Sequence, residues 1–248
     1  MLYLLKKFLK YFLVILSFLS VNSGIFLTSV SAYNSDHKVI IIAANGVGDT
    51  YFHAKRQFES EGWSVSTAGL TSSVTSCPNT NPRPIPVDFL ISELTNSTIT
   101  QYEAIFIPSG GHWFPLINDV RTLNLISDAY DLRLVISSLC VGIRVLARAN
   151  IINEVRIAYD INSVDYVEAA GGILVNKEVV SDQRIVTGGT GGGPTGGGAN
   201  NAPTIEVCEA IEDLVAPPNI FLSIIIVGIT GVALVGLITF FKKKEKKK

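Results

Sequence analysis

The stretch from Leu132 to Arg148, LRLVISSLCVGIRVLAR, has the pattern of a buried strand, a tight turn and a helix. Its first half is a run of aliphatic and small residues with one charge, which is typical of a parallel strand covered on both faces. Cys140 stands where the strand ends, and Gly142 follows where the chain must turn. A nucleophile between a strand and a helix is the arrangement called an elbow. The stretch therefore predicts an α/β fold together with a candidate reactive group.

Strand-like and helix-like segments alternate on both sides of this stretch. Strands separated by helices predict right-handed crossovers and a doubly wound, mostly parallel sheet. The middle of the chain, residues 71–86, is rich in Ser, Thr, Asn and Pro and is predicted to be a surface loop. We expect strands at residues 38–44, 63–69, 102–108, 132–138, 155–160, 173–175, 179–180 and 184–187, and helices at 49–62, 113–130, 140–148 and 204–214.

Residues 1–32 have the layout of a secretory signal peptide. Three lysines precede an apolar run at residues 11–19, and Val30-Ser31-Ala32 offers small residues at a cleavage site. The apolar region is lengthened by residues 25–27, so an uncleaved amino-terminal anchor is the alternative.

A second apolar segment, residues 219–241, is predicted to be a transmembrane helix. It contains 22 residues without a charge, Ile220 to Phe241, enough to cross a hydrocarbon core of about 30 Å. The tail at residues 242–248, KKKEKKK, should stay on the cytoplasmic side. We therefore expect a single-pass protein of the cell membrane, with residues 33–218 outside the cytoplasm and residues 219–248 in contact with membrane lipid. A buried core helix is the alternative for the apolar segment.

The charge of the chain is distributed unevenly. Of 20 Lys and Arg, nine lie in residues 1–32 and 242–248, whereas 20 of the 21 Asp and Glu lie between them. Residues 33–218 therefore keep 11 basic and 20 acidic residues, a formal charge of −9. Such a domain repels the phosphates of nucleic acid, so no nucleic-acid partner is expected and the ligand is predicted to be a small molecule or a peptide.

Cys140 is the candidate nucleophile. The amino terminus of the following helix favours a thiolate, and Ser138 is loosely the small residue that an elbow carries two positions earlier. The alternative is structural, because a buried cysteine also serves as a small apolar side chain. The other cysteines, Cys77 and Cys208, could form a disulfide in an oxidising compartment. No cofactor or metal site is predicted.

Two glycine-rich segments resemble nucleotide-binding loops only weakly. Gly188–Gly198 has eight glycines in eleven residues, but no Lys-Ser or Lys-Thr follows, so a flexible insertion is the stronger interpretation. The turn at residues 45–48, NGVG, lacks the third glycine of a dinucleotide fingerprint.

Five places occur in a characteristic order along residues 37–214: the first strand and its turn, residues 108–111 (PSGG), 140–142 (CVG), 170–180 and 184–187 (RIVT). Together they resemble the ThiJ/PfpI family, whose class I glutamine-amidotransferase-like fold includes the parkinsonism-associated protein deglycase and the PfpI-type proteases. The resemblance implies that Cys140 is reactive, that backbone N–H groups of Gly110, Gly111 and Val141 form an oxyanion pocket, and that the protein forms a homodimer.

The sequence also departs from that family's pattern. Members place a glutamate on the loop after the first strand, where it hydrogen-bonds the cysteine, and this chain has the shorter Asp49. Many members have a histidine directly after the cysteine, where Val141 stands, and others supply one from the following strand, where this chain has Tyr159-Asp160. The family's arginine after the last strand is replaced by the glycine-rich segment.

His112 is the remaining candidate base, because it follows the glycine pair near the carboxyl edge of the sheet, where ligands bind in such folds. A helix-start residue facing solvent is the alternative. The predicted catalytic residues are thus Cys140, with His112 and Asp49 as its candidate partners.

Three functions fit these residues. The first is a cysteine-dependent hydrolase, acting as a peptidase, an amidase or a deglycase-like enzyme. The second is a catalytically degenerate ectodomain that binds a ligand or a partner, because the family's glutamate and adjacent histidine are missing. The third is a redox sensor in which the Cys140 thiol is oxidised.

Overall fold

The computed structural model describes residues 37–77, 82–189 and 202–215, and from Lys38 onward these belong to one compact unit. Within those three ranges, no helix has the length and the apolar character needed to span a membrane. The predicted signal peptide, the predicted span at residues 219–241 and the lysine-rich tail lie outside them, as does most of the glycine-rich segment.

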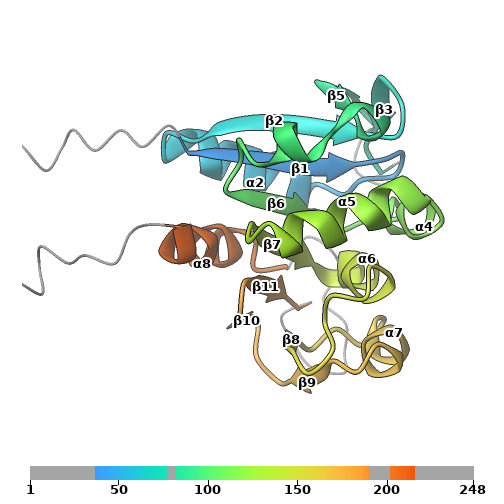
Figure 1. Ribbon diagram of the computed structural model, residues 1–248, viewed down its shortest axis with the longest axis vertical. Coiled ribbons are helices and arrows are strands. Elements are labelled where there is room, and N and C mark those ends of the chain that lie inside the picture. Colours follow the sequence, from blue (N-terminus) through green and yellow to red (C-terminus); the bar gives the residue numbers. More distant parts are fainter. Residues whose placement is uncertain (1–36, 78–81, 190–201, 216–248) are drawn as a thin grey trace, which may run out of the picture. The chain divides into compact units, whose positions relative to one another are not determined.

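A seven-stranded sheet forms the centre of this unit, in the order β10-β11-β7-β6-β1-β2-β5 (Figure 1). Its neighbouring strands run parallel, except that β10 and β11 are antiparallel. From Val39 to Ala43 every residue of β1 is fully buried, as a continuous aliphatic run predicts for a central strand. The strands span Lys38–Ala43 (β1), Ser64–Gly69 (β2), Phe89–Leu90 (β5), Ala104–Ile107 (β6), Val135–Leu139 (β7), Val179–Asp182 (β10) and Ile185–Gly188 (β11).

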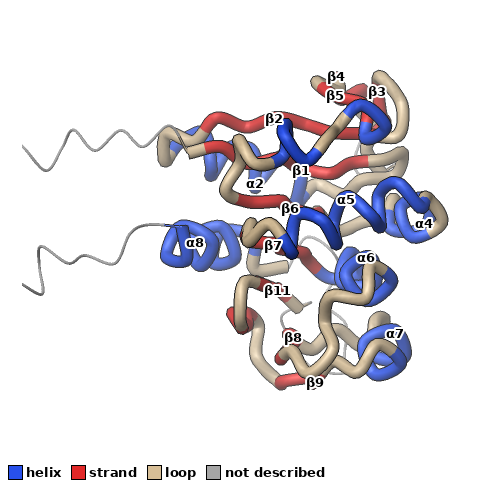
Figure 2. Tube along the Cα trace, in the orientation of Figure 1, coloured by secondary structure: helices blue, strands red, loops and turns tan. Residues whose placement is uncertain are grey.

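Helices cover both faces of the sheet (Figure 2), so the predicted doubly wound, mostly parallel α/β fold is found. Apolar residues of α4, α5 and α6 lie on one face, with α7 packed against α6 and β9, and those of α2 and α8 pack on the other face. The helices are α2 (Thr50–Ser60), α3 (Asn96–Ile99), α4 (Trp113–Ile117), α5 (Val120–Asp131), α6 (Ile143–Arg148), α7 (Val164–Ala169) and α8 (Thr204–Val215), with 3-10 turns η2 (Ile91–Glu93) and η3 (Cys140–Gly142).

The single helix predicted at residues 113–130 is wrong, because the chain forms α4 and α5 with a break between them. Asp119 has an extended backbone there, and its carboxylate accepts a hydrogen bond from the Thr122 backbone N–H at 2.9 Å. An aspartate in this position caps the amino terminus of a new helix.

The loop predicted at residues 71–86 also contains regular structure. β3 (Ser73–Thr75) and β4 (Pro84–Pro86) pair antiparallel, and the central residues Val74 and Ile85 are buried while their neighbours are exposed. Two more strands, β8 (Arg156–Ala158) and β9 (Ile173–Val175), pair parallel with each other as a separate small sheet beside the main one.

Candidate functional site

Cys140 occupies the predicted elbow. It follows β7 directly, begins the 3-10 turn that leads into α6, and has a backbone φ of 51°. A positive φ is strained for a residue with a side chain, and such strain is concentrated at functional sites. Gly142 makes the tight turn feasible, because a Cβ there would lie 2.7 Å from both the Pro108 carbonyl oxygen and Ser138 Oγ.

The Cys140 thiol has a carboxyl partner that the sequence did not assign to the site. The sulfur lies 3.8 Å from Oδ1 of Asp160, which follows β8 and is fully buried. The other oxygen, Oδ2, accepts a hydrogen bond of 2.5 Å from the hydroxyl of Ser163, also fully buried. Each oxygen of this carboxyl therefore has one hydrogen-bond partner.

The surroundings of Cys140 favour the protonated thiol. Burial raises its pKa to about 12, and the negative charge of Asp160 acts in the same direction. The backbone N–H of Val141, which hydrogen-bonds the sulfur, and the positive charge of Arg144 oppose this increase. In its resting state the site therefore contains a thiol rather than the thiolate that a helix amino terminus alone would favour.

The predicted oxyanion donors lie in two loops at the carboxyl edge of the sheet. Gly110 and Gly111 belong to the loop after β6, and Val141 belongs to the turn after β7. Gly110 has a φ of 113°, and a Cβ on it would lie 2.4 Å from the backbone nitrogen of Gly48. The Gly48 N–H donates to the Ser109 carbonyl at 2.8 Å, which fixes the first turn against the glycine pair. The roles of these backbone groups stay predictions.

His112 is fully buried at the start of α4, so the alternative of a solvent-facing residue is wrong. Its Nε2 lies 2.8 Å from the Pro108 carbonyl oxygen and must carry the proton, because a carbonyl only accepts. Burial lowers the pKa of the ring to about 4, and Nδ1 has no partner in the described part of the chain. The Pro108 carbonyl also lies close to Gly142, so the hydrogen bond from His112 fixes a backbone group that contacts the turn after Cys140. Its catalytic role stays a prediction.

Asp49 directly precedes α2, and its side chain makes no capping bond. One of its carboxyl oxygens, Oδ1, is buried without a hydrogen-bond partner among the residues the structure describes. The charged groups that act on Cys140 are instead Asp160 and Arg144. The structure thus brings Asp160 to the thiol, while the role predicted for Asp49 stays untested.

Arg144, in the first turn of α6, was not identified from the sequence. Its guanidinium carbon lies 4.2 Å from the ring centre of Trp113 and 5.0 Å from that of Tyr166. The two rings meet edge to face at 5.8 Å, and the guanidinium also donates to the Asn162 carbonyl. No periodic pattern marks these residues, because they come from three separate elements.

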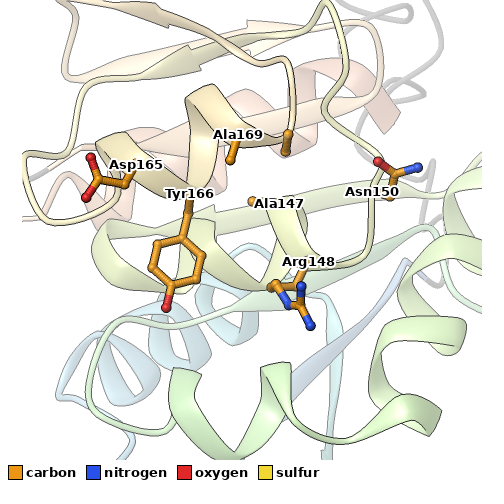
Figure 3. Close-up of a pocket in the computed structure, with 7 residues that line it drawn as sticks. Ala147, Arg148, Asn150, Asp165, Tyr166 and Ala169 are labelled. Atoms are coloured by element: carbon orange, nitrogen blue, oxygen red, sulfur yellow. The ribbon is translucent and has the colours of Figure 1, made fainter.

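A pocket of about 490 Å³ is lined by residues of α6 and α7, Tyr166 among them (Figure 3). Asp165 and Tyr166 reach it from α7, and Arg148 reaches it from α6. Alanines supply most of the remaining lining, and Tyr166 links the pocket to the ring cluster around Arg144. The lining residues are Ala147, Arg148, Asn150, Asp165, Tyr166, Ala169 and Ala170.

The disulfide that Cys77 and Cys208 could form in an oxidising compartment is absent from the structure, in which Cys208 is a free thiol buried in α8. Across residues 37–77, 82–189 and 202–215, no group of three His, Cys, Asp or Glu side chains is placed to hold a metal ion.

The fold and the elbow together define a flavodoxin-like α/β protein with a cysteine at the turn from strand to helix. The model of the DJ-1/PfpI family matches residues 37–195, and the chain belongs to that family. The resemblance inferred from the sequence is therefore confirmed. No curated protein matches the chain in sequence.

Solved structures share the fold at low sequence identity. A ThiJ/PfpI domain protein from Brachyspira murdochii is 18% identical with a TM-score of 0.60, and the match covers 71% of this chain and 94% of that one. Schizosaccharomyces pombe DJ-1 is 15% identical with a TM-score of 0.61, covering 75% and 96%. Drosophila melanogaster DJ-1beta is 17% identical with a TM-score of 0.58, covering 73% and 92%. At these identities the likeness shows the fold alone.

Proposed function

We propose that the protein is a cysteine-dependent enzyme of the hydrolase or deglycase type, in which Cys140 attacks a substrate carbonyl and Asp160 carries the proton. The observation that supports this most is the hydrogen bond from the Cys140 thiol to a fully buried carboxyl, at a residue with positive φ. A buried titratable pair and a strained backbone at one place are typical of a functional site.

The first step transfers the thiol proton to Asp160 Oδ1 while the sulfur forms a bond to the carbonyl carbon. Because burial raises the pKa of Cys140 to about 12, the proton must leave during the attack rather than before it. The electron pair of the carbonyl moves to its oxygen, and the Val141 N–H, which already points at the sulfur, can donate to that oxyanion.

The second step returns the proton. For an acyl substrate, the tetrahedral intermediate collapses, the bond to the leaving group breaks, and Asp160 protonates that group. Water then attacks the thioester, its proton passes to Asp160, and the released sulfur takes the proton back, so that the acid leaves and the resting site returns. Ser163 holds Asp160 by the hydrogen bond to Oδ2 throughout this cycle.

The two other functions remain as competing hypotheses. Oxidation of Cys140 requires a thiolate, and the protonated, buried thiol is a poor substrate for mild oxidants. A ligand-binding ectodomain without activity would not require a carboxyl to be kept against the thiol. Both observations support the enzyme over these alternatives.

The proposal also includes the location of the enzyme: residues 219–241 anchor it to a membrane, with the catalytic domain on the outer face. Its support is the uncharged stretch of 22 residues and the basic tail that follows. Alkaline carbonate should leave the full chain in the membrane fraction and release a chain that ends at residue 218. A full chain that is released as readily would contradict the anchor.

A homodimer, implied by the family resemblance, is part of the same proposal and is tested by the mass of the detergent-solubilised protein.

The activity is tested by turnover of an activated acyl ester, a peptide amide and a glyoxal-derived adduct. Cys140→Ala should abolish turnover of the accepted substrate, and Asp160→Asn should lower kcat by about 10²–10⁴-fold, the range for loss of a general acid and base. Asp131→Asn, an exposed carboxylate at the end of α5, is the matched control and should leave kcat unchanged.

Asp49→Asn tests the competing assignment of the carboxylate. The proposal is wrong if Cys140→Ala retains turnover. Asp160 is the wrong partner if Asp49→Asn lowers kcat and Asp160→Asn does not.

A further inference from the structure

The guanidinium of Arg144 is held from three directions. The guanidinium carbon lies 4.2 Å from the ring centre of Trp113 in α4 and 5.0 Å from that of Tyr166 in α7, and the Asn162 carbonyl accepts a hydrogen bond from the guanidinium. A cation in contact with two aromatic rings is stabilised by each of them. The side chain of Arg144 therefore has a defined position beside the elbow.

The Asn162 carbonyl belongs to the turn that carries the carboxyl partner of the thiol. In this turn the Ser163 N–H donates to the Asp160 carbonyl at 2.9 Å, and the Ser163 hydroxyl donates to Oδ2. A bond to Asn162 thus fixes a four-residue turn, residues 160–163, whose first residue is Asp160. Since Arg144 lies one residue into α6, it connects this turn to the helix that begins at the elbow.

The contacts of Arg144 require its planar shape as well as its charge. A guanidinium stacks on a ring face and presents its donors in a fixed plane, whereas an ammonium is a compact charge on a flexible stem. Lysine would keep the attraction for the Cys140 sulfur but lose the simultaneous contacts with the two rings and the carbonyl.

We propose that Arg144 is a positioning residue that holds the turn at residues 160–163 so that Asp160 stays against the Cys140 thiol. Its consequence for catalysis rests on the proposed function, but its effect on the thiol does not. Trp113 of α4 and Tyr166 of α7 form the aromatic clamp, the pair of rings that keeps the guanidinium of Arg144 in position.

The test is a double-mutant cycle read from the alkylation of Cys140 by iodoacetamide, in the full chain, with each cysteine quantified by mass spectrometry. In the protein that keeps Arg144, Asp160→Asn should speed the alkylation of Cys140 at mildly alkaline pH by about tenfold or more. The reason is that a carboxylate beside a thiol lowers the fraction of thiolate, which is the reactive form. In the Arg144→Lys background, the same change should give about threefold or less, because Asp160 is no longer held in place.

Arg148→Lys is the matched control: this arginine at the end of α6 is exposed and lines the same pocket as Tyr166, but it is Arg144 whose guanidinium lies over the rings of Trp113 and Tyr166. It should leave the effect of Asp160→Asn at its full size. Tyr166→Leu, which removes one ring of the clamp and keeps the arginine, should weaken the effect in the same direction as Arg144→Lys and serves if that variant folds poorly.

An effect of full size in both Arg144→Lys and Tyr166→Leu overturns the positioning role. This outcome leaves the proposed enzyme intact, because that proposal fails separately, on turnover that survives Cys140→Ala. A reduced effect in both variants, with Arg148→Lys unchanged, supports the positioning role whatever substrate the enzyme accepts.

Discussion

Cys140 and Cys208 are both buried thiols, yet they lie in different surroundings. Burial raises the pKa of each, so neither burial nor the pKa distinguishes them. Cys208 lies within the regular helix α8, in an apolar cluster between that helix and the sheet. Cys140 instead has a strained backbone and a carboxyl partner. The comparison teaches that strain and a polar partner, rather than burial, separate a candidate site from a core residue.

The largest effect on stability should come from adding a side chain at Gly142, in the turn between β7 and α6. Gly142→Ala places a methyl group 2.7 Å from the backbone oxygen of Pro108, which cannot move without displacing β6 and the His112 contact. We expect a loss of about 2–4 kcal/mol in the free energy of unfolding. Denaturant titration measures it. Gly111→Ala is the control, because its Cβ would meet nothing closer than 3.9 Å. Equal stability of the two variants would show that the backbone around Gly142 is not as crowded as described.

The two cysteines should respond differently to serine. In Cys208→Ser the hydroxyl enters an apolar cluster, and an unsatisfied buried hydroxyl costs about 1–3 kcal/mol. In Cys140→Ser the hydroxyl has Asp160 as an acceptor nearby, so the cost should be smaller. Thermal unfolding of both variants checks the order. A larger loss for Cys140→Ser would break the distinction between the two sites.

The smallest effect concerns the acidic groups of the helix that carries Cys208. Burial, with Glu61, Glu209 and Asp213 nearby, raises the pKa of Glu212 from 4.5 to about 7. The folded state therefore favours the protonated form of Glu212. The contribution of this group to the free energy of unfolding is present below pH 4.5 and is lost as the pH rises through about 7.

Glu212→Gln removes this dependence and should unfold at a higher temperature than the parent above pH 7. Because the Glu212 side chain is only partly buried, solvent screens its interactions, and the gain should be about 1 kcal/mol or less, or a few degrees. Below pH 4.5 the two proteins should unfold together. A constant difference across this pH range would show that Glu212 does not titrate abnormally.

The sequence predicted the features that depend on local pattern. Continuous aliphatic runs placed β1, β6 and β7, and a cysteine followed by Gly142 placed the elbow, because strands, turns and their breakers are encoded by neighbouring residues. The end of α4 at Ile117 was missed although its signal is also local: Asp119 caps α5 by accepting from the Thr122 N–H three residues on, and the expected helix ran across it.

The partner of the thiol could not be predicted in this way. Asp49 and Asp160 both follow a strand, and the choice between them depends on where β8 lies beside the main sheet, which is a matter of tertiary packing. Arg144, Trp113 and Tyr166 were missed for the same reason, because their contacts join elements far apart in the chain.

The central claim, that Asp160 exchanges a proton with Cys140 and thereby serves catalysis, is tested most directly by measuring thiol reactivity and turnover on the same variant. In Asp160→Asn, alkylation of Cys140 should become about tenfold faster while kcat falls, and alkylation of Cys208 should not change. Unchanged alkylation of Cys140, or a kcat equal to that of the parent protein, would contradict the account.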